Sequence, residues 1–501
     1  MFNWRSHVPS HAAWVLALMG IAPIAHAQVA AGSALARDPF RQVFVVPGGE
    51  SMPALKCPVV KKKKPLTPPS EPRSGGANAP AGDAEEEIPL TEEDEKSFVR
   101  NGLAPPTAEE LRRQAPRQDG LKALHAQLRE SSQQGLARVG VWGGSHMAAE
   151  FFTSEIRKAL SERYGAGGPG HVNLMYGRPG IRVPVNAVCR YGQWREELAP
   201  RGMGTGTAIT GAGLFAMISG EANAGLEVDV SAAPSASPPH NASLHFLRQP
   251  DGGRFEVWVD GQSLGVFDTA GPLGLGVLDV KGKQGLSRLK IQALDTAHVT
   301  LLGLFAEQDK GVVLDNFGIA GASGNYWTTV QADLLMQIQQ HRPYDVVVLA
   351  YGTNDVTGKE WDPEAYRWKF QKTLQAMRAI HPQAHCILIP PGDRVTRYKV
   401  QKTVRLKNGK TRKVVQTHYD LLTFPQRHMQ VSRIQRELGS QHACVTWDMS
   451  LEMRKAGGAY AMMKQTPPWM AGDLIHLTPI GYQEMAKLFN QWFSSSLGPA
   501  H

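Results

Sequence analysis

The stretch that decides the fold is RVGVWGGSHM, residues Arg138–Met147. Its apolar first half is typical of a buried strand, and Gly143 and Gly144 allow the sharp turn that joins a strand to a helix. Ser145 follows directly, where the helix is expected to begin. A serine at this edge of a sheet can point its hydroxyl into a crevice beside helix amide groups, as a nucleophile does. It can also act as the N-cap of the helix, and the stretch alone leaves both interpretations open.

Strand and helix patterns alternate on both sides of this stretch. Thr107 and Glu110 match a capping box, and leucines on one face predict a helix over residues 118–133. A single helix is expected after Ser145, because an apolar stripe recurs at helical spacing. From Val312 the rhythm resumes with strands at 344–350, 386–389 and 443–447 and with helices from Asp362, from Pro425 and from Thr478-Pro479. Largely apolar strands separated by helices predict an α/β domain with a parallel sheet.

Residues 165–311 follow a different pattern. Short alternating runs with glycine and proline replace the helices, and Asp260-Gly261 lies between two runs as a hairpin turn. The runs are 226–230, 255–259, 289–293 and 299–305. Several short strands without a helix predict a β-sandwich inserted into the α/β domain.

The N-terminal part predicts export. Arg5, a short apolar run and the A-x-A site Ala25-His26-Ala27 have the form of a secretory signal peptide over residues 1–27. Residues 28–106 combine a lysine run, prolines and an acidic run, which predicts a low-complexity linker that is largely disordered. We therefore expect an exported protein, periplasmic in a cell with two membranes, without an integral membrane segment after signal cleavage. The α/β domain is expected to be discontinuous, over 107–164 and 312–501.

The net charge and the cysteines of the sequence say little about the function. The formal net charge is +9, but much of it is local, notably in a probable hairpin at 394–413 with Asn408-Gly409 at its tip. Nucleic acid is therefore not indicated as a partner. The hairpin follows a strand's carboxyl end, where it can steer an anionic polymer inward or simply lie in solvent. Among the four cysteines, Cys386 and Cys444 lie in apolar strands, and both a bridge and buried free thiols remain open.

Three further motifs join Ser145 in chain order. Gly321 in NFGIAGAS (316–323) can offer a backbone N–H without a side chain in the way, and Asn354 in GTND offers an amide at a strand's end. Asp473 and His476 in DLIH are spaced so that, in a helical turn, the carboxylate holds one imidazole nitrogen. The other nitrogen is then free to take the Ser145 proton.

The order Ser, Gly, Asn, Asp-x-x-His resembles the SGNH hydrolase superfamily, the GDSL-type esterases. The SHMAAE block at Ser145 and the large β insertion are similar, more narrowly, to bacterial peptidoglycan O-acetylesterases. The resemblance covers roughly residues 118–496. It implies a flavodoxin-like three-layer α/β sheet with an inserted β-sandwich, over 165–311, that is like a carbohydrate-binding module.

The resemblance also implies the roles of the site residues. Ser145 is the nucleophile, His476 the general base and then acid, and Asp473 the partner that orients it. The Ser145 N–H, the Gly321 N–H and the Asn354 side chain form the oxyanion hole, with Gly318 as a second glycine in the same block. One departure is Gly144, where the family's Gly-Asp-Ser has aspartate.

The implied reaction is removal of O-acetyl groups from a cell-wall polysaccharide, with peptidoglycan as the expected partner and an acetyl-serine intermediate. It requires no cofactor and no metal. Three alternatives remain open: acetyl transfer by the same residues, acetylesterase activity on cellulose, xylan or alginate, and a non-catalytic glycan-binding protein.

Overall fold

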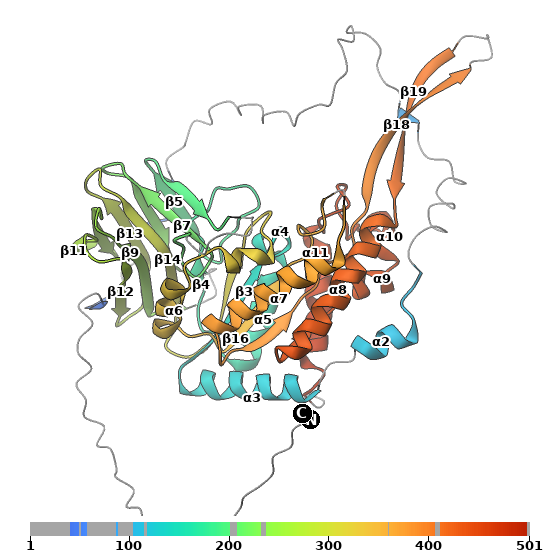
Figure 1. Cartoon of the computed structure of the whole chain (residues 1–501). Coiled ribbons are helices and arrows are strands. Elements are labelled where there is room, and N and C mark those ends of the chain that lie inside the picture. The colour runs from blue at the N-terminus through green and yellow to red at the C-terminus, as the bar shows by residue number, and fades with distance from the viewer. Residues whose placement is uncertain are drawn as a thin grey trace, which may run out of the picture. The chain divides into compact units, whose positions relative to one another are not determined.

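A computed structural model describes residues 41–49, 52–57, 87–88, 104–114, 118–200, 208–231, 237–358, 360–405 and 411–497 (Figure 1). The predicted signal peptide and most of the predicted linker lie outside the described residues. Within the described ranges, no helix has the length and apolar character needed to cross a membrane.

The central sheet has five parallel strands in the order β15-β3-β16-β17-β20. Their bounds are β3 (Leu136–Gly143), β15 (Gly311–Gly318), β16 (Val346–Ala350), β17 (His385–Leu388) and β20 (Cys444–Thr446). Counted along the chain, this is the order 2-1-3-4-5 of flavodoxin-like folds, which confirms the predicted fold class. Such sheets bind ligands beyond the carboxyl ends of their strands, and that is where β3 delivers Ser145.

Alternate side chains of each central strand enter two different apolar layers. On one face, Val139, Val141 and Val348 pack with α3 (Gln118–Gln134), α5 (Phe151–Tyr164) and α11 (Pro479–Ser494). On the other face, Trp142 and Leu349 pack with α6 (Ala332–His341), α7 (Pro363–Ile380) and α8 (Thr423–Gln441). The sheet is therefore buried on both sides, as its nearly unbroken apolar strands require. The remaining helical segments are α2 (Ala108–Gln114), α4 (Ser145–Ala148), η1 (Gly324–Thr328), α9 (Met449–Lys455) and α10 (Gly458–Lys464).

The single helix expected after Ser145 is instead two helices. The short α4 ends before Glu150, whose φ of 64° lies in the left-handed region, and α5 begins at Phe151. The buried Glu150 carboxylate accepts hydrogen bonds from Arg157 at 2.9 Å and from the Asn316 amide at 3.1 Å. Asn316 comes from β15, far along the chain, so the helical pattern could not reveal this backbone conformation.

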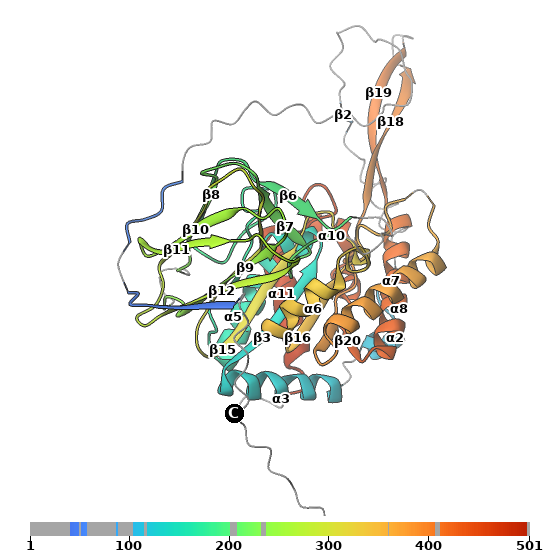
Figure 2. The same ribbon diagram turned by 60° about the vertical axis from the view of Figure 1, so that its left-hand side comes forward.

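Two sheets form the inserted sandwich, as predicted (Figure 2). The larger runs in the order β1-β12-β9-β14-β7-β6 with β4 beside β14, and the smaller in the order β11-β10-β13-β8-β5. Asp260 and Gly261 form the predicted turn, both with positive φ. The strands are β4 (Gly170–Val172), β5 (Ala187–Tyr191), β6 (Arg195–Leu198), β7 (Phe215–Ser219), β8 (Gly225–Asp229), β9 (Asn241–Arg248), β10 (Arg254–Val259), β11 (Gln262–Asp268), β12 (Gly274–Gly282), β13 (Arg288–Ala293) and β14 (Val299–Glu307).

The prediction of a disordered linker over 28–106 needs correction in two places. Residues Arg41–Val46 form β1, an edge strand that pairs in parallel with β12, and Glu87–Ile88 (β2) pairs with β19 (Thr411–Asp420). Phe44 packs edge-on against Phe267, and Val46 is buried. The alternation in β1 is only six residues long, so the low-complexity composition around it outweighed it in the sequence.

Two disulfides join segments that are distant in the chain. Cys386–Cys444 links the neighbouring strands β17 and β20, which resolves the alternative left open by the sequence. Cys57–Cys189 attaches the segment after β1 to β5 of the sandwich. The second bridge had no sequence signal, because its two ends meet only when β1 has joined the sandwich.

Candidate active site

The structure brings Ser145, His476 and Asp473 into one hydrogen-bonded chain. His476 Nε2 lies 2.8 Å from Ser145 Oγ, and His476 Nδ1 lies 2.7 Å from Asp473 Oδ2. Ser145 opens α4 at the carboxyl end of β3, whereas the other two residues lie in the loop before α11. With Nδ1–H donated to the carboxylate, Nε2 is free to accept the serine proton.

The Asp473–His476 loop is a tight turn and not the helical turn that the sequence spacing suggested. Asp473 Oδ1 accepts the backbone N–H groups of Ile475 and His476, each at 3.0 Å, and Leu474 between them has a φ of 58°. Burial opposes ionisation of Asp473, but hydrogen bonds from the His476 side chain and from these N–H groups prevail and lower its pKa. The carboxylate is therefore charged at neutral pH and can stabilise an imidazolium at His476.

The predicted basic hairpin begins beside this loop. The Val395 N–H donates to Leu474 O at 3.0 Å, so the hairpin β18 (Thr396–Arg405) and β19 leaves the fold next to the triad. Its predicted tip, Asn408-Gly409, lies outside the described residues. The expected position of its base near the active site is confirmed.

His146, for which the sequence gave no role, packs beside the imidazole of His476. Its Nδ1 lies 3.0 Å from the Tyr482 hydroxyl, and its ring centroid is 5.4 Å from that of His476. Desolvation lowers the pKa of His146 to about 3, so its ring is neutral at neutral pH. A neutral ring fixed by α11 thus limits the movement of His476 without adding a competing charge.

Gly318 and Gly321, the two glycines of NFGIAGAS (316–323), have different structural roles. The Gly318 N–H donates to Asn316 Oδ1 at 2.8 Å, and a Cβ at Gly318 would lie 2.4 Å from the Ala148 backbone nitrogen. Gly318 therefore allows α4 to pack closely on β15. Gly321 has a φ of 81°, and none of the described residues accepts a hydrogen bond from its N–H. Gly321 is therefore the better candidate for the predicted oxyanion donor.

Asn354 is oriented by the same loop. Its Nδ2 donates to Ala322 O at 2.9 Å, which leaves the second amide proton for another acceptor. The Ser145 N–H stands in the first turn of α4, where no intrahelical acceptor exists. A Cβ at Gly144 would lie 3.1 Å from Asn354 Nδ2. Glycine at this position, where the Gly-Asp-Ser pattern has aspartate, therefore leaves the Asn354 amide undisturbed.

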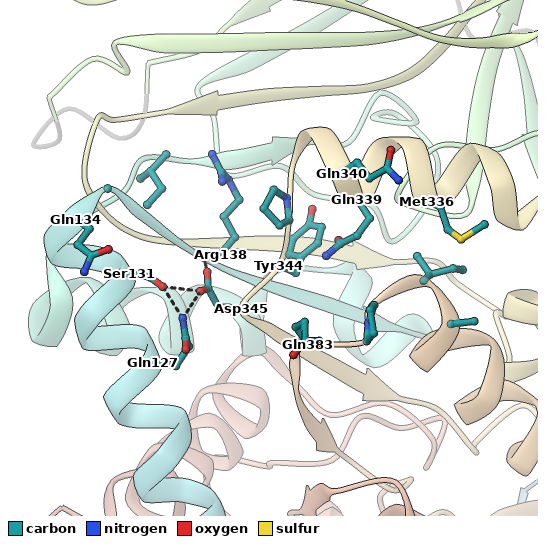
Figure 3. Close-up of a pocket in the computed structure, with 16 residues that line it drawn as sticks. Gln127, Ser131, Gln134, Arg138, Met336, Gln339, Gln340, Tyr344, Asp345 and Gln383 are labelled. Carbon is teal, nitrogen blue, oxygen red and sulfur yellow. Dashed lines mark hydrogen bonds between the residues drawn. The ribbon is translucent and has the colours of Figure 1, made fainter. Parts of the chain in front are cut away.

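A pocket of about 530 Å³ opens beside these donors. Gly321 and Asn354 form part of its wall, and the residues that line it are Gly321, Ser323, Asn325, Asn354, Asp355, Thr357, Glu360, Trp361, Asp362, Ala365, Tyr366 and Lys369. A second pocket, of about 750 Å³, lies at the opposite end of the sheet (Figure 3). In this pocket Asp345 accepts hydrogen bonds from Ser131 and Gln127 of α3. Asp345 directly precedes β16, so the pocket lies at the amino ends of β16 and β3, away from Ser145.

Asp355 in the first pocket gives a pH-dependent prediction. Desolvation raises its pKa to about 7, against the Lys369 charge and nearby backbone N–H groups. Between pH 4 and 7 the folded chain then binds more protons than the unfolded chain, so this group lowers stability as pH rises. We expect the difference in Tm, Asp355→Asn minus wild type, to grow between pH 5 and pH 8 in thermal unfolding.

The control for that experiment is Glu364→Gln on α7, whose carboxylate is 80% exposed. A constant Tm difference for Asp355→Asn, equal to that of the control, would contradict the prediction. Glu360, Asp362 and Lys369 face the same pocket and stay in place in both variants.

Among the described residues, no group of three or more His, Cys, Asp or Glu side chains is arranged to hold a metal ion.

Comparison with known proteins identifies the type of domain. Residues 292–484 match the GDSL-like Lipase/Acylhydrolase family, a range that contains Gly321, Asn354, Asp473 and His476 but not Ser145. A comparison with curated protein sequences finds no match.

Two solved structures are among those that match the chain. A peptidoglycan O-acetylesterase structure is similar with a TM-score of 0.57 and 21% identity, over 76% of this chain and 96% of that one. A family two carbohydrate esterase from Clostridium thermocellum, in complex with cellohexaose, matches with a TM-score of 0.24 and 11% identity, over 56% of this chain and 95% of that one. The first likeness supports the SGNH-type fold, and the family match supplies the reaction class. The chain contains a GDSL-like lipase/acylhydrolase domain and is a carboxylic ester hydrolase.

Proposed function

We propose that this hydrolase removes O-acetyl groups from a cell-wall polysaccharide, with peptidoglycan as its substrate. The observation that carries the reaction is the hydrogen-bonded chain Ser145–His476–Asp473 beside the donors of Gly321 and Asn354. The similarity in fold to a peptidoglycan O-acetylesterase supports the choice of substrate.

In the first half-reaction, Ser145 Oγ attacks the acetyl carbonyl carbon and its proton moves to His476 Nε2. The carbonyl oxygen becomes an oxyanion that accepts from the Ser145 N–H, the Gly321 N–H and the Asn354 amide. The bond between the carbonyl carbon and the sugar oxygen then breaks. The sugar oxygen takes the proton from Nε2 and leaves as a hydroxyl, and the acetyl group remains on Ser145.

In the second half-reaction, water repeats the attack. It gives a proton to His476 Nε2 as it adds to the acetyl-serine carbonyl, and the same donors hold the new oxyanion. Collapse returns the proton to Ser145 Oγ and releases acetate. Asp473 stays ionised throughout and stabilises the imidazolium.

Export to an oxidising compartment, periplasmic in a cell with two membranes, belongs to the same proposal. Both disulfides, Cys57–Cys189 and Cys386–Cys444, are of the kind that persists outside the reducing cytosol. The N-terminal signal pattern supports the same location.

The test of the proposed substrate is acetate release from O-acetylated peptidoglycan. We expect release from the native polymer and none from polymer that was first de-acetylated with base. Acetylated xylan, at equal acetyl content, serves as the comparison glycan. Faster release from xylan would contradict the peptidoglycan assignment, and acetate that appears only as new glycan esters would indicate acetyl transfer.

A further inference from the structure

We propose that the 530 Å³ pocket beside Gly321 and Asn354 is a subsite for a neutral pyranose that carries an acetamido group. This inference rests on the proposed function, because the sugar in question is a neighbour of the acetylated unit in the same glycan. The volume of the pocket falls within the range of small-molecule sites.

The position of the pocket determines what can occupy it. Gly321 and Asn354 contribute both to the oxyanion donors and to the pocket wall. A group in the pocket is therefore next to the carbonyl that undergoes attack. In a polymeric substrate, the group next to the acetylated sugar is another part of the same glycan chain.

An unsatisfied acceptor marks the polar side of the pocket. Asp355 lines the pocket, and its buried Oδ2 has no hydrogen-bond partner among the residues that the structure describes. Backbone N–H groups of Gly352 and of Asp355 itself favour the charged carboxylate, and burial opposes it. A buried acceptor without a partner costs about 1–3 kcal/mol, and a ligand that donates an O–H or N–H removes this cost. Sugar hydroxyl and acetamido groups are such donors.

An aromatic ring provides the apolar side. Trp361 lines the pocket, packs on Tyr366 with ring centroids 5.6 Å apart, and donates its indole N–H to Gln430. Both contacts fix the indole plane before a ligand arrives. A flat, fixed ring together with a few convergent polar groups suits a pyranose, which has an apolar C–H face and polar edges.

The charges of the pocket favour a neutral ligand. The Asp362 carboxylate already has partners within the protein. It caps α7 by accepting hydrogen bonds from the backbone N–H groups of Glu364 at 2.9 Å and Ala365 at 3.1 Å. The exposed Glu360 and Lys369 have opposite signs. No excess of positive charge is thus available for an anionic group, and the structure assigns the pocket to an uncharged acetamido sugar.

The first experiment compares polymer with a small ester. We expect Trp361→Ala and Asp355→Asn each to lower the ratio of kcat/KM on O-acetylated peptidoglycan to kcat/KM on p-nitrophenyl acetate by about tenfold or more. In Asp355→Asn an amide NH2 group replaces one carboxylate oxygen of the pocket wall, so an acceptor becomes a donor. The ratio cancels any general loss of folded or active enzyme.

Trp368→Ala is the matched control, because Trp368 lies on α7, the helix that begins directly after the Trp361 segment, is 50% exposed and lies outside this pocket. We expect the ratio of the control to stay within about twofold of wild type. Ratios within about twofold for both pocket variants would overturn the proposed subsite.

The second experiment measures binding without catalysis. The probe is a β-1,4-linked tetramer of N-acetylglucosamine, titrated calorimetrically into Ser145→Ala. We expect saturable binding that weakens about tenfold or more when Trp361→Ala or Asp355→Asn is added. Binding that the added substitutions leave unchanged would contradict the subsite. Failure of the proposed function would appear separately, as polymer hydrolysis that survives Ser145→Ala.

Discussion

Replacement of Ser145 by alanine is expected to lower kcat on p-nitrophenyl acetate and on O-acetylated peptidoglycan by at least about 10⁴-fold. The variant loses the oxygen that lies 2.8 Å from His476 Nε2 and that carries the acetyl group in the proposed mechanism. The oxyanion donors remain, so the residual rate reflects binding and oxyanion stabilisation alone. The measurement is steady-state acetate release, with wild-type enzyme assayed in parallel.

The fold should tolerate this change. Gly144, not Ser145, is the N-cap of α4. Replacement of Ser145 by alanine therefore removes no side-chain hydrogen bond that caps the helix. We expect a Tm within a few degrees of wild type. Mass spectrometry after a brief incubation with substrate should detect an acetyl adduct on the wild type and none on the variant. Acetate release at the wild-type rate by Ser145→Ala would disprove the nucleophile assignment.

Replacement of Asn354 by alanine is expected to lower kcat by about 10²–10³-fold, with a much smaller change in KM. The Asn354 amide uses one N–H on Ala322 O, and its second proton is available for the oxyanion. An interaction that forms mainly in the transition state affects kcat more than substrate binding.

Asn490→Ala is a suitable control for this loss. Asn490 lies on α11, and its side-chain amide also donates to a backbone carbonyl, that of Glu155, at 3.4 Å. We expect its kcat to stay near the wild-type value. An equal fall in kcat for both variants, or a change at Asn354 that is confined to KM, would argue against the oxyanion role.

The parallel sheet and its helices could be predicted because their signals are local. Val346–Ala350 is continuously apolar, and the helix after it begins at Asp362 with Pro363 in the first turn. The predicted capping box is present as well, with Thr107 and Glu110 bonded in both directions. Such patterns reflect backbone geometry and burial, which neighbouring residues largely determine.

The break between α4 and α5 could not be predicted, because its cause is not local. Glu150 takes its left-handed conformation while its carboxylate is bound by Arg157 and by Asn316 of β15. The prediction of a helical turn at Asp473–His476 was wrong for a similar reason. Leu474 has a positive φ there, its side chain is buried, and its carbonyl accepts from Val395.

The sequence by itself determined the fold class and the candidate chemical groups, because strand ends in a parallel sheet gather at one edge whatever the loops do. Only the tertiary structure decided which of these groups meet. Ser145 and His476 are 331 residues apart, and their contact depends on the docking of α11 against α5. The same holds for β1, for Cys57–Cys189 and for the pocket at Asp355, since each forms only where distant segments pack together. Local periodicity carries no information about such contacts.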